Sequence, residues 1–245
     1  MTLQDSGIEI HRNHTVAPTR FQIFGERSTG THIVGRFVMR HLNLKLIHDY
    51  GWKHGFPSMP GVAPEHLIIV CFRNAEDWLR SMHTKPWHCS PAMQKLDFSD
   101  FIRARWDSVV DREDAFPWTA PGTQMMDLQL DRHPITGKRF RNLVSMRNSK
   151  HRAHLGFRNR NVNLLMVRME AVLADPEGFL QKVSDGFALP DPEPFRPIKQ
   201  RLGSKFKALV DDRPETPDAI TIEDREFLLD QLNLQMEAEI GYTYD

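Results

Sequence analysis

Residues 21–42 read FQIFGERSTGTHIVGRFVMRHL, and this stretch decides the fold class. Its first four residues form a short strand pattern, and small and polar residues break that pattern over 25–32. Behind the break, apolar residues recur at helical spacing: Ile33, Val34, Phe37, Val38 and Leu42. The order of strand, tight loop and helix aims backbone N–H groups and the positive end of a helix at one point. The stretch predicts an α/β fold with an anion-binding loop.

This loop differs from the nucleoside triphosphate loop, GxxxxGK[ST], in the residues that carry its chemistry. Gly25 and Gly30 keep the glycine spacing, but Thr31 and His32 stand where the lysine and the magnesium-binding hydroxyl would be. Arg27 supplies a fixed charge from inside the loop. The pattern favours an anion bound without magnesium, although the same residue types also form ordinary strand-to-helix turns.

The composition is that of a soluble globular protein. A chain of 245 residues can bury a sizeable core, and we expect one domain over residues 1–245. No apolar run approaches the ~18 residues of a membrane span, and the N-terminus lacks the apolar segment of a secretory signal. Cys71 and Cys89 provide no disulfide framework, so we expect a reducing cytoplasm.

The charge is balanced overall but uneven along the chain. The net charge of zero, from 32 basic and 32 acidic side chains, gives no general attraction to nucleic acid. Residues 132–169 are nevertheless rich in Lys and Arg and contain no Asp or Glu. This basic segment could face an anionic ligand, or it could be a solvated helix face balanced by acids elsewhere.

Periodicity predicts the remaining elements. The buried run 67–72 and the run 163–168 indicate strands, with a shorter strand over 44–48. Residues 1–19 are polar and indicate an arm or an edge segment. Helices are expected at four places: after Asn74, over 98–110, from Asp175-Pro176 to about Gly186, and over 221–240. Proline and glycine without periodicity over 111–137 indicate an irregular insertion, which we interpret as part of a substrate lid at about 111–160.

Two further residues extend the predicted anion site. Arg73 leaves the carboxyl end of the strand 67–72, and Ser81 lies about two turns along the helix that follows. A long guanidinium and a short hydroxyl on these elements could converge on one anion.

Three pieces of the chain together resemble the sulfotransferases that use 3′-phosphoadenosine 5′-phosphosulfate. The pieces are Arg27-Ser28-Thr29-Gly30-Thr31-His32, the pair Arg73 and Ser81, and Arg168-Met169-Glu170 followed by Leu173-Ala174-Asp175-Pro176. The resemblance covers about 21–86 and 163–190. It implies a three-layer, P-loop-like fold with a central parallel sheet flanked by helices. It also implies that the loop binds the 5′-phosphosulfate and that Arg73 and Ser81 hold the 3′-phosphate.

The resemblance implies transfer of a sulfuryl group to a hydroxyl or amine, without a metal. Arg27, where the family usually has Lys, would stabilise the leaving phosphate together with Lys53 and the loop N–H groups. The family's catalytic base is often a His in Lys-x-His-x-x-Pro, and Lys53-His54-Gly55-Phe56-Pro57 moves that His one place forward. His54 is the first candidate for the base, and His32, His83 and Glu26 are the others.

Other functions remain open on the sequence. The alternatives are a P-loop kinase or nucleoside triphosphatase, or a nucleotide-binding protein that has lost catalysis. The histidines and cysteines show no zinc spacing. The acceptor could be a sugar, a lipid head group or a small phenol, bound by the basic segment and by aromatic residues such as Trp52, Phe56, Trp87 and Trp118. The sequence leaves these acceptors, and the oligomeric state, open.

Overall fold

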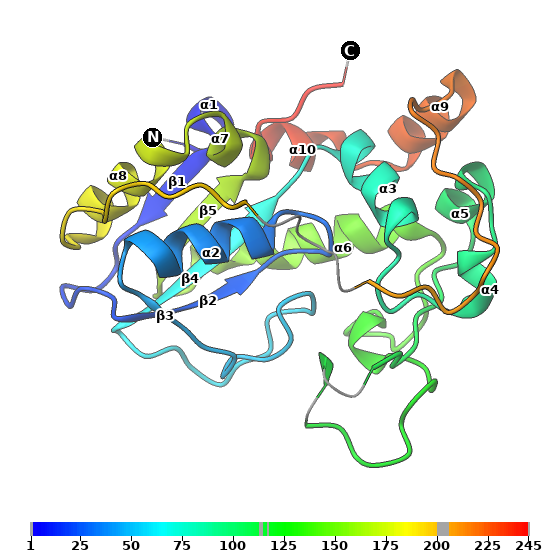
Figure 1. Ribbon diagram of the computed structural model, residues 1–245, viewed down its shortest axis with the longest axis horizontal. Helices are drawn as coiled ribbons and strands as arrows, with labels where there is room; N and C mark the ends of the chain where they lie inside the picture. Colours follow the sequence, from blue (N-terminus) through cyan, green and yellow to red (C-terminus); the bar gives the residue numbers. More distant parts are fainter. Residues whose placement is uncertain (1, 113–114, 117, 200–205, 245) are drawn as a thin grey trace. The chain divides into compact units, whose positions relative to one another are not determined.

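The computed structural model describes residues 2–112, 115–116, 118–199 and 206–244 (Figure 1). The chain divides into two compact units. Unit 1 comprises Met1–Asn74, Lys150–Leu202 and Asn233–Asp245, and unit 2 comprises Ala75–Ser149 and Gly203–Leu232. This division by contacts does not test whether residues 1–245 form one domain, so that expectation stays a prediction.

Unit 1 is built on a five-stranded sheet with the order β1-β5-β4-β2-β3. The strands are β1 (Ile8–His11), β2 (Arg20–Phe24), β3 (Lys45–Leu46), β4 (His66–Phe72) and β5 (Asn163–Arg168). Neighbouring strands are parallel except at one edge, where β1 pairs with β5 in the antiparallel direction. The predicted α/β class with a mostly parallel central sheet is confirmed, and the N-terminal residues do supply an edge segment.

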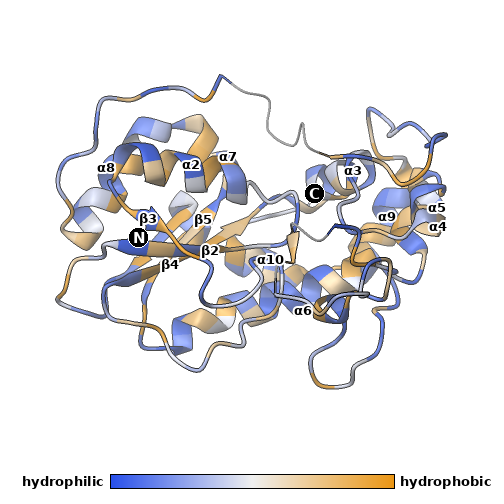
Figure 2. Ribbon diagram, turned by 60° about the horizontal axis from the view of Figure 1, so that its bottom comes forward, coloured by the Kyte–Doolittle hydropathy of each residue, from blue (hydrophilic) through white to orange (hydrophobic). Residues whose placement is uncertain are grey.

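Helices pack on both faces of this sheet, as β4 shows most clearly. Leu67, Ile69 and Cys71 belong to one apolar core, which also contains residues of α2 (Thr31–His41), α7 (Met169–Ala174) and α8 (Pro176–Phe187). The alternate residues of β4 belong to a second core, with residues of α1 (Leu3–Ser6), α10 (Leu234–Ile240), the C-terminal part of α6 (Leu143–Leu155) and the 3-10 helix η3 (Gly156–Asn159). The apolar residues of the central strands β4 and β5 are accordingly coloured as hydrophobic in Figure 2. The arrangement is compatible with a three-layer α/β fold.

The regular elements that the structure describes in unit 2 are mainly helices, joined by long irregular segments. Unit 2 contains α3 (Ala75–Thr84), α4 (Pro91–Gln94), α5 (Phe98–Arg103), the first part of α6 and α9 (Ile222–Gln231). Between α5 and α6, the described residues form the 3-10 helix η2 (Gln129–Asp131) and two isolated bridges, Cys89↔Ser108 and Val109↔Asp127. The insertion predicted at about 111–160 is therefore irregular only in its first part, because helix α6 begins within it at Leu143.

Two predicted helices differ from the structure at their C-terminal ends. The helix expected over 98–110 ends at Arg103, because Ala104 takes an extended backbone and Val109 enters a bridge. The helix expected over 221–240 is two helices, because the chain extends at Leu232 and the Asn233 side chain accepts a hydrogen bond from Met236 N to start α10. The strand expected over 44–48 is reduced to β3.

Helix α6 has no counterpart among the predicted elements, and its composition explains why. Its fully buried side chains include Arg147, Lys150, His151 and His154, which follow one another at helical spacing. A buried face made of polar residues has no apolar periodicity, so the usual signal for an amphipathic helix is missing. No described helix is both long enough and apolar enough to cross a membrane.

Candidate functional site

The predicted loop lies where the strand order of unit 1 reverses. The chain passes from β2 to β3 on one side and then returns to β4 on the other side of β2. The carboxyl ends of β2 and β4 are adjacent, with Phe24 paired to Val70. Open α/β sheets bind ligands at this point, outside the carboxyl ends of the strands. Residues 25–30 leave β2 here, and Arg73 directly follows β4.

The loop is tight, and its glycines have physical reasons. A Cβ atom on Gly25 would lie 2.7 Å from the carbonyl oxygen of Cys71. Gly30 caps α2 with a φ of 87°, and a Cβ there would lie 2.9 Å from the Met169 side chain. Ser28 has a φ of 65°, a left-handed conformation that is uncommon without glycine and is often found where a ligand is clamped.

The amino end of α2 suits an anion. Its cap, Gly30, offers no side-chain acceptor, and the first turn holds no acidic residue. The first N–H groups of a helix lack the usual partner four residues earlier, although Ile33 N–H here donates to the Gly30 carbonyl oxygen. The helix dipole makes this end positive. The amino end of α2 therefore has the positive character that the predicted anion-binding loop requires.

Arg73 is brought to the loop, as the sequence predicts. Its Nη1 donates a hydrogen bond to the Ser28 carbonyl oxygen at 3.1 Å, and its side chain is half-buried. The next residue, Asn74, donates its backbone N–H to Glu170 Oε1 at 2.9 Å. Glu170 also accepts a hydrogen bond from the Tyr242 hydroxyl at 2.7 Å. The ends of β2, β4 and β5 thus meet at this site.

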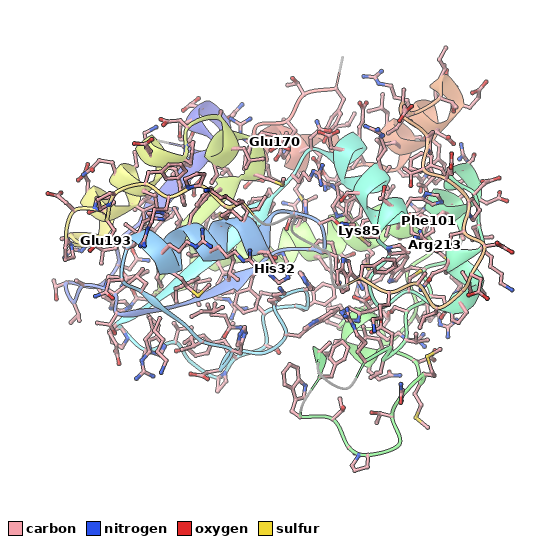
Figure 3. The ribbon with its side chains drawn as sticks, viewed as in Figure 1. His32, Lys85, Phe101, Glu170, Glu193 and Arg213 are labelled. Atoms are coloured by element: carbon pink, nitrogen blue, oxygen red, sulfur yellow. The ribbon has the colours of Figure 1, made fainter. Side chains whose placement is uncertain are left out.

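The third segment of the resemblance, Arg168-Met169-Glu170, lies beside the loop, but Arg168 itself has a structural role. Its Nη1 donates to the Gly241 carbonyl oxygen at 2.6 Å and joins β5 to the C-terminal segment. Figure 3 marks Glu170 at the start of α7 and His32 at the start of α2, the two elements that face each other across Gly30 and Met169.

Lys53 and His54 hold the first residue of the loop from the other side. Gly25 donates its N–H to the Lys53 carbonyl oxygen at 3.0 Å, and its own carbonyl oxygen lies 2.6 Å from His54 Nδ1. A carbonyl oxygen only accepts, so His54 Nδ1 carries the proton. In the neutral ring, the basic nitrogen is then Nε2. The imidazole is buried, with 7% of the residue exposed.

The side chain of Lys53 supplies a cation with a lowered pKa beside the loop. Burial lowers the pKa of Lys53 to about 8, so its ammonium form still predominates at neutral pH. Lys53 Nζ lies 3.0 Å from Nε2 of His32, an exposed residue in the first turn of α2. An ammonium group can only donate, so His32 accepts and is neutral, with its proton on Nδ1.

The other charged residues of the loop lie inside unit 1. Arg27 Nε donates to Glu26 Oε1 at 2.8 Å, and Lys150 Nζ lies 2.7 Å from Glu26 Oε2. Arg27 is 1% exposed, and Glu26 and Lys150 are fully buried. Both cations lie against the Trp52 ring, 5.5 and 5.3 Å from its centroid. The guanidinium of Arg27 is thus held by a carboxylate in the interior, and its contact with a bound anion stays a prediction.

Sequence reasoning missed the buried basic face of α6. Its Lys150 reaches the loop through Glu26, and its His154 supports the segment after His54. His154 Nε2 donates to the Gly55 carbonyl oxygen at 3.1 Å, and burial lowers the pKa of His154 to about 4. The signal was present in the basic segment 132–169, where Arg147, Lys150, His151 and His154 recur at positions i, i+3, i+4 and i+7.

Two residues of the prediction belong to unit 2. Ser81 lies half-buried on α3, and the structure describes it within that unit. His83, one of the alternative bases, has both ring nitrogens engaged: Nδ1 lies 2.7 Å from Thr216 Oγ1, and Nε2 lies 3.1 Å from the Leu96 carbonyl oxygen. These contacts give His83 a structural role within unit 2.

In the part of the chain that the structure describes, no group of three or more His, Cys, Asp or Glu residues is placed to hold a metal ion. Comparison with known proteins found no family model, no curated sequence and no solved structure that matches the chain.

Proposed function

We propose that the protein is a sulfotransferase that moves a sulfuryl group from 3′-phosphoadenosine 5′-phosphosulfate to a hydroxyl or amine of an acceptor. One observation carries the proposal: Arg73 hydrogen-bonds the Ser28 carbonyl, so two motifs 45 residues apart meet at the switch point of the sheet. The loop has the glycine spacing of a phosphate-binding loop, but Thr31 and His32 replace the lysine and magnesium ligand of triphosphate enzymes. These features favour an anion that is bound without magnesium.

In the proposed reaction, the acceptor oxygen or nitrogen forms a bond to sulfur while the bond from sulfur to the 5′-phosphate oxygen breaks. The products are the sulfated acceptor and 3′-phosphoadenosine 5′-phosphate. Negative charge develops on the leaving phosphate oxygen, where fixed donors and cations lower the barrier. We assign this stabilisation to the N–H groups of Ser28, Gly30 and Thr31 and to the Lys53 ammonium, because Gly25, Arg27 and Thr29 donate their N–H groups to Lys53 and Glu26. The basic nitrogen for the acceptor proton is assigned to His54 Nε2. His32 could replace it only after releasing the hydrogen bond that its Nε2 accepts from Lys53.

The interior charges support the loop in this proposal. Glu26 accepts from Arg27 and lies against Lys150, so it fixes the backbone of the loop at a residue next to Gly25. Fixed geometry matters because donors that need no rearrangement stabilise a transition state most effectively. Arg27 then supplies a permanent positive charge beside Glu26 in the loop, and Arg73 is assigned to the 3′-phosphate. The same role for Ser81, which belongs to unit 2, stays a prediction of the resemblance.

Calorimetric titration tests the donor site directly. We expect 3′-phosphoadenosine 5′-phosphate to bind without magnesium, and ATP with magnesium to bind weakly or not at all. A preference for ATP with magnesium would instead identify a triphosphate site and overturn the proposal. Binding of the adenosine bisphosphate without transfer of sulfate to a broad acceptor panel would favour a nucleotide-binding protein that has lost catalysis.

A further inference from the structure

Unit 2 contains a cavity that is lined by none of the residues assigned to the donor. Its volume is about 540 Å³, within the range of small-molecule sites. The lining residues that the structure describes lie from Val110 to Leu130, between α5 and α6. The apolar ones are Val110, Phe116, Trp118, Met126, Leu128 and Leu130. These described residues thus line a largely apolar pocket within unit 2.

The pocket is accessible to solvent, although its walls are apolar. Trp118 is 56% exposed and Met126 is 60% exposed. Both side chains line the cavity, so its apolar wall can be reached from solvent. Phe116 and Trp118 lie nearly perpendicular, with ring centroids 6.2 Å apart, and so present an aromatic wall to a planar ligand.

The polar side chains of the pocket are largely engaged by the protein itself. Thr119 Oγ1 donates to the Phe116 carbonyl oxygen at 2.8 Å, and Thr123 Oγ1 donates to the Ala120 carbonyl oxygen at 3.0 Å. The carboxylate of Asp127 forms ion pairs with both Arg132 and Arg139. A sugar would bury several hydroxyls among these walls with few partners, and an unpaired buried hydroxyl is costly. An anionic head group would meet no uncompensated cation among the described lining residues.

We propose that this pocket binds an uncharged, ring-shaped apolar compound that carries a single hydroxyl, a phenol or a comparable alcohol. The apolar volume and the aromatic wall accommodate the ring, and the small number of uncommitted polar groups limits the ligand to about one hydroxyl. That such a compound is the sulfuryl acceptor rests on the proposed function, whereas its binding to unit 2 does not.

The test uses 2-naphthol as the probe and the full chain. We expect calorimetry to show 2-naphthol binding without any nucleotide, and N-acetylglucosamine to show none. Met126→Lys places a charge in the pocket and should weaken 2-naphthol binding at least about ten-fold, because the ammonium loses hydration on ligand binding. Ile135→Lys is the matched control: Ile135 is 88% exposed and is not a lining residue, so binding should be unchanged.

A second readout locates the probe without a mutation in the wall. With methionine methyl groups labelled with carbon-13, 2-naphthol should shift the Met126 resonance through its ring current, whereas Met59, in unit 1, should not move. Three results would overturn the proposal: no binding of 2-naphthol, equal affinities in the two lysine variants, or equal binding of the sugar. Titration with 3′-phosphoadenosine 5′-phosphate in the same samples tests the donor site separately, so failure of one site is distinguishable from failure of the other.

Discussion

At the scale of single residues, Arg73 provides the most direct test of the donor site. Arg73→Ala should weaken binding of 3′-phosphoadenosine 5′-phosphate by roughly 1.5–3 kcal/mol, the usual contribution of a hydrogen bond to a charged group. Calorimetry measures this loss. Arg20→Ala is the control, because Arg20 is exposed at the opposite end of β2. Equal affinity in wild type and Arg73→Ala would remove Arg73 from the site.

His54 needs a variant that separates its two functions. Its Nδ1–H holds the Gly25 carbonyl, so His54→Ala should weaken nucleotide binding as well as turnover. His54→Asn places an amide N–H near the position of Nδ1 but cannot accept a proton. We therefore expect His54→Asn to keep nucleotide affinity within about two-fold and to lose about 10²–10⁴-fold in turnover. Wild-type turnover in this variant would move the base to His32 or Glu26.

Lys53 predicts a pH dependence of binding. Burial lowers the pKa of Lys53 to about 8, so its positive charge is present below that pH and is lost as the pH rises through it. Affinity for the adenosine bisphosphate should therefore be several-fold weaker at pH 9 than at pH 7. Lys53→Arg, which stays charged, should show a flatter profile between these pH values. The same decline in both proteins would show that another group titrates.

At the scale of elements, α6 is joined to the loop through a buried ion pair. Lys150→Met removes the ammonium that lies 2.7 Å from Glu26 Oε2, and removing one partner of a buried pair usually costs about 3–5 kcal/mol. Urea denaturation should show this loss in the free energy of unfolding. Arg152→Met, on the same helix, removes an exposed partner 3.9 Å from Glu239 and should cost less than about 1 kcal/mol. Equal losses would contradict a structural role for Lys150.

At the scale of the whole molecule, the buried histidines should make stability fall in mild acid. The pKa of His154 is lowered by burial from 6.5 to about 4, so the unfolded chain binds a proton that the folded chain does not. His154 thus leaves the free energy of unfolding independent of pH above pH 6.5. As the pH falls from 6.5 to 4, it lowers that free energy by up to about 3 kcal/mol. Burial also lowers the pKa of His83, so this residue of unit 2 likewise destabilises the folded state as the pH falls.

Denaturation at several pH values measures this effect. His154→Gln keeps a donor for the Gly55 carbonyl but does not titrate, so its unfolding free energy should fall less between pH 6.5 and pH 4. A parallel decline in wild type and variant would rule out His154 as the source. Below about pH 4, a second loss is expected. Burial acts to raise the pKa values of Glu9 and Asp224, but hydrogen bonds from Arg158 and Arg103 lower them below their ordinary values.

The sequence by itself determined the elements whose signals are local. The run from Phe21 to Leu42 contains the strand, the glycine loop and the apolar helix face, and the uninterrupted apolar run before Arg73 identifies a strand covered on both faces. Parallel strands place their carboxyl ends at one edge of a sheet, so the sequence placed the loop and Arg73 at the same edge. That β2 and β4 are neighbours was decided by the fold.

Only the tertiary structure decided which charges are buried together. Nothing in the sequence near Glu26 indicates that Lys150, 124 residues away, lies 2.7 Å from it, or that His54 donates to Gly25. The polar face of α6 also gave no apolar period, so the helix was predictable neither by hydropathy nor by its partners. The physical reason is that burial of a charge is favourable only when its partner is in place, and that partner is supplied by the fold, not by the neighbouring residues.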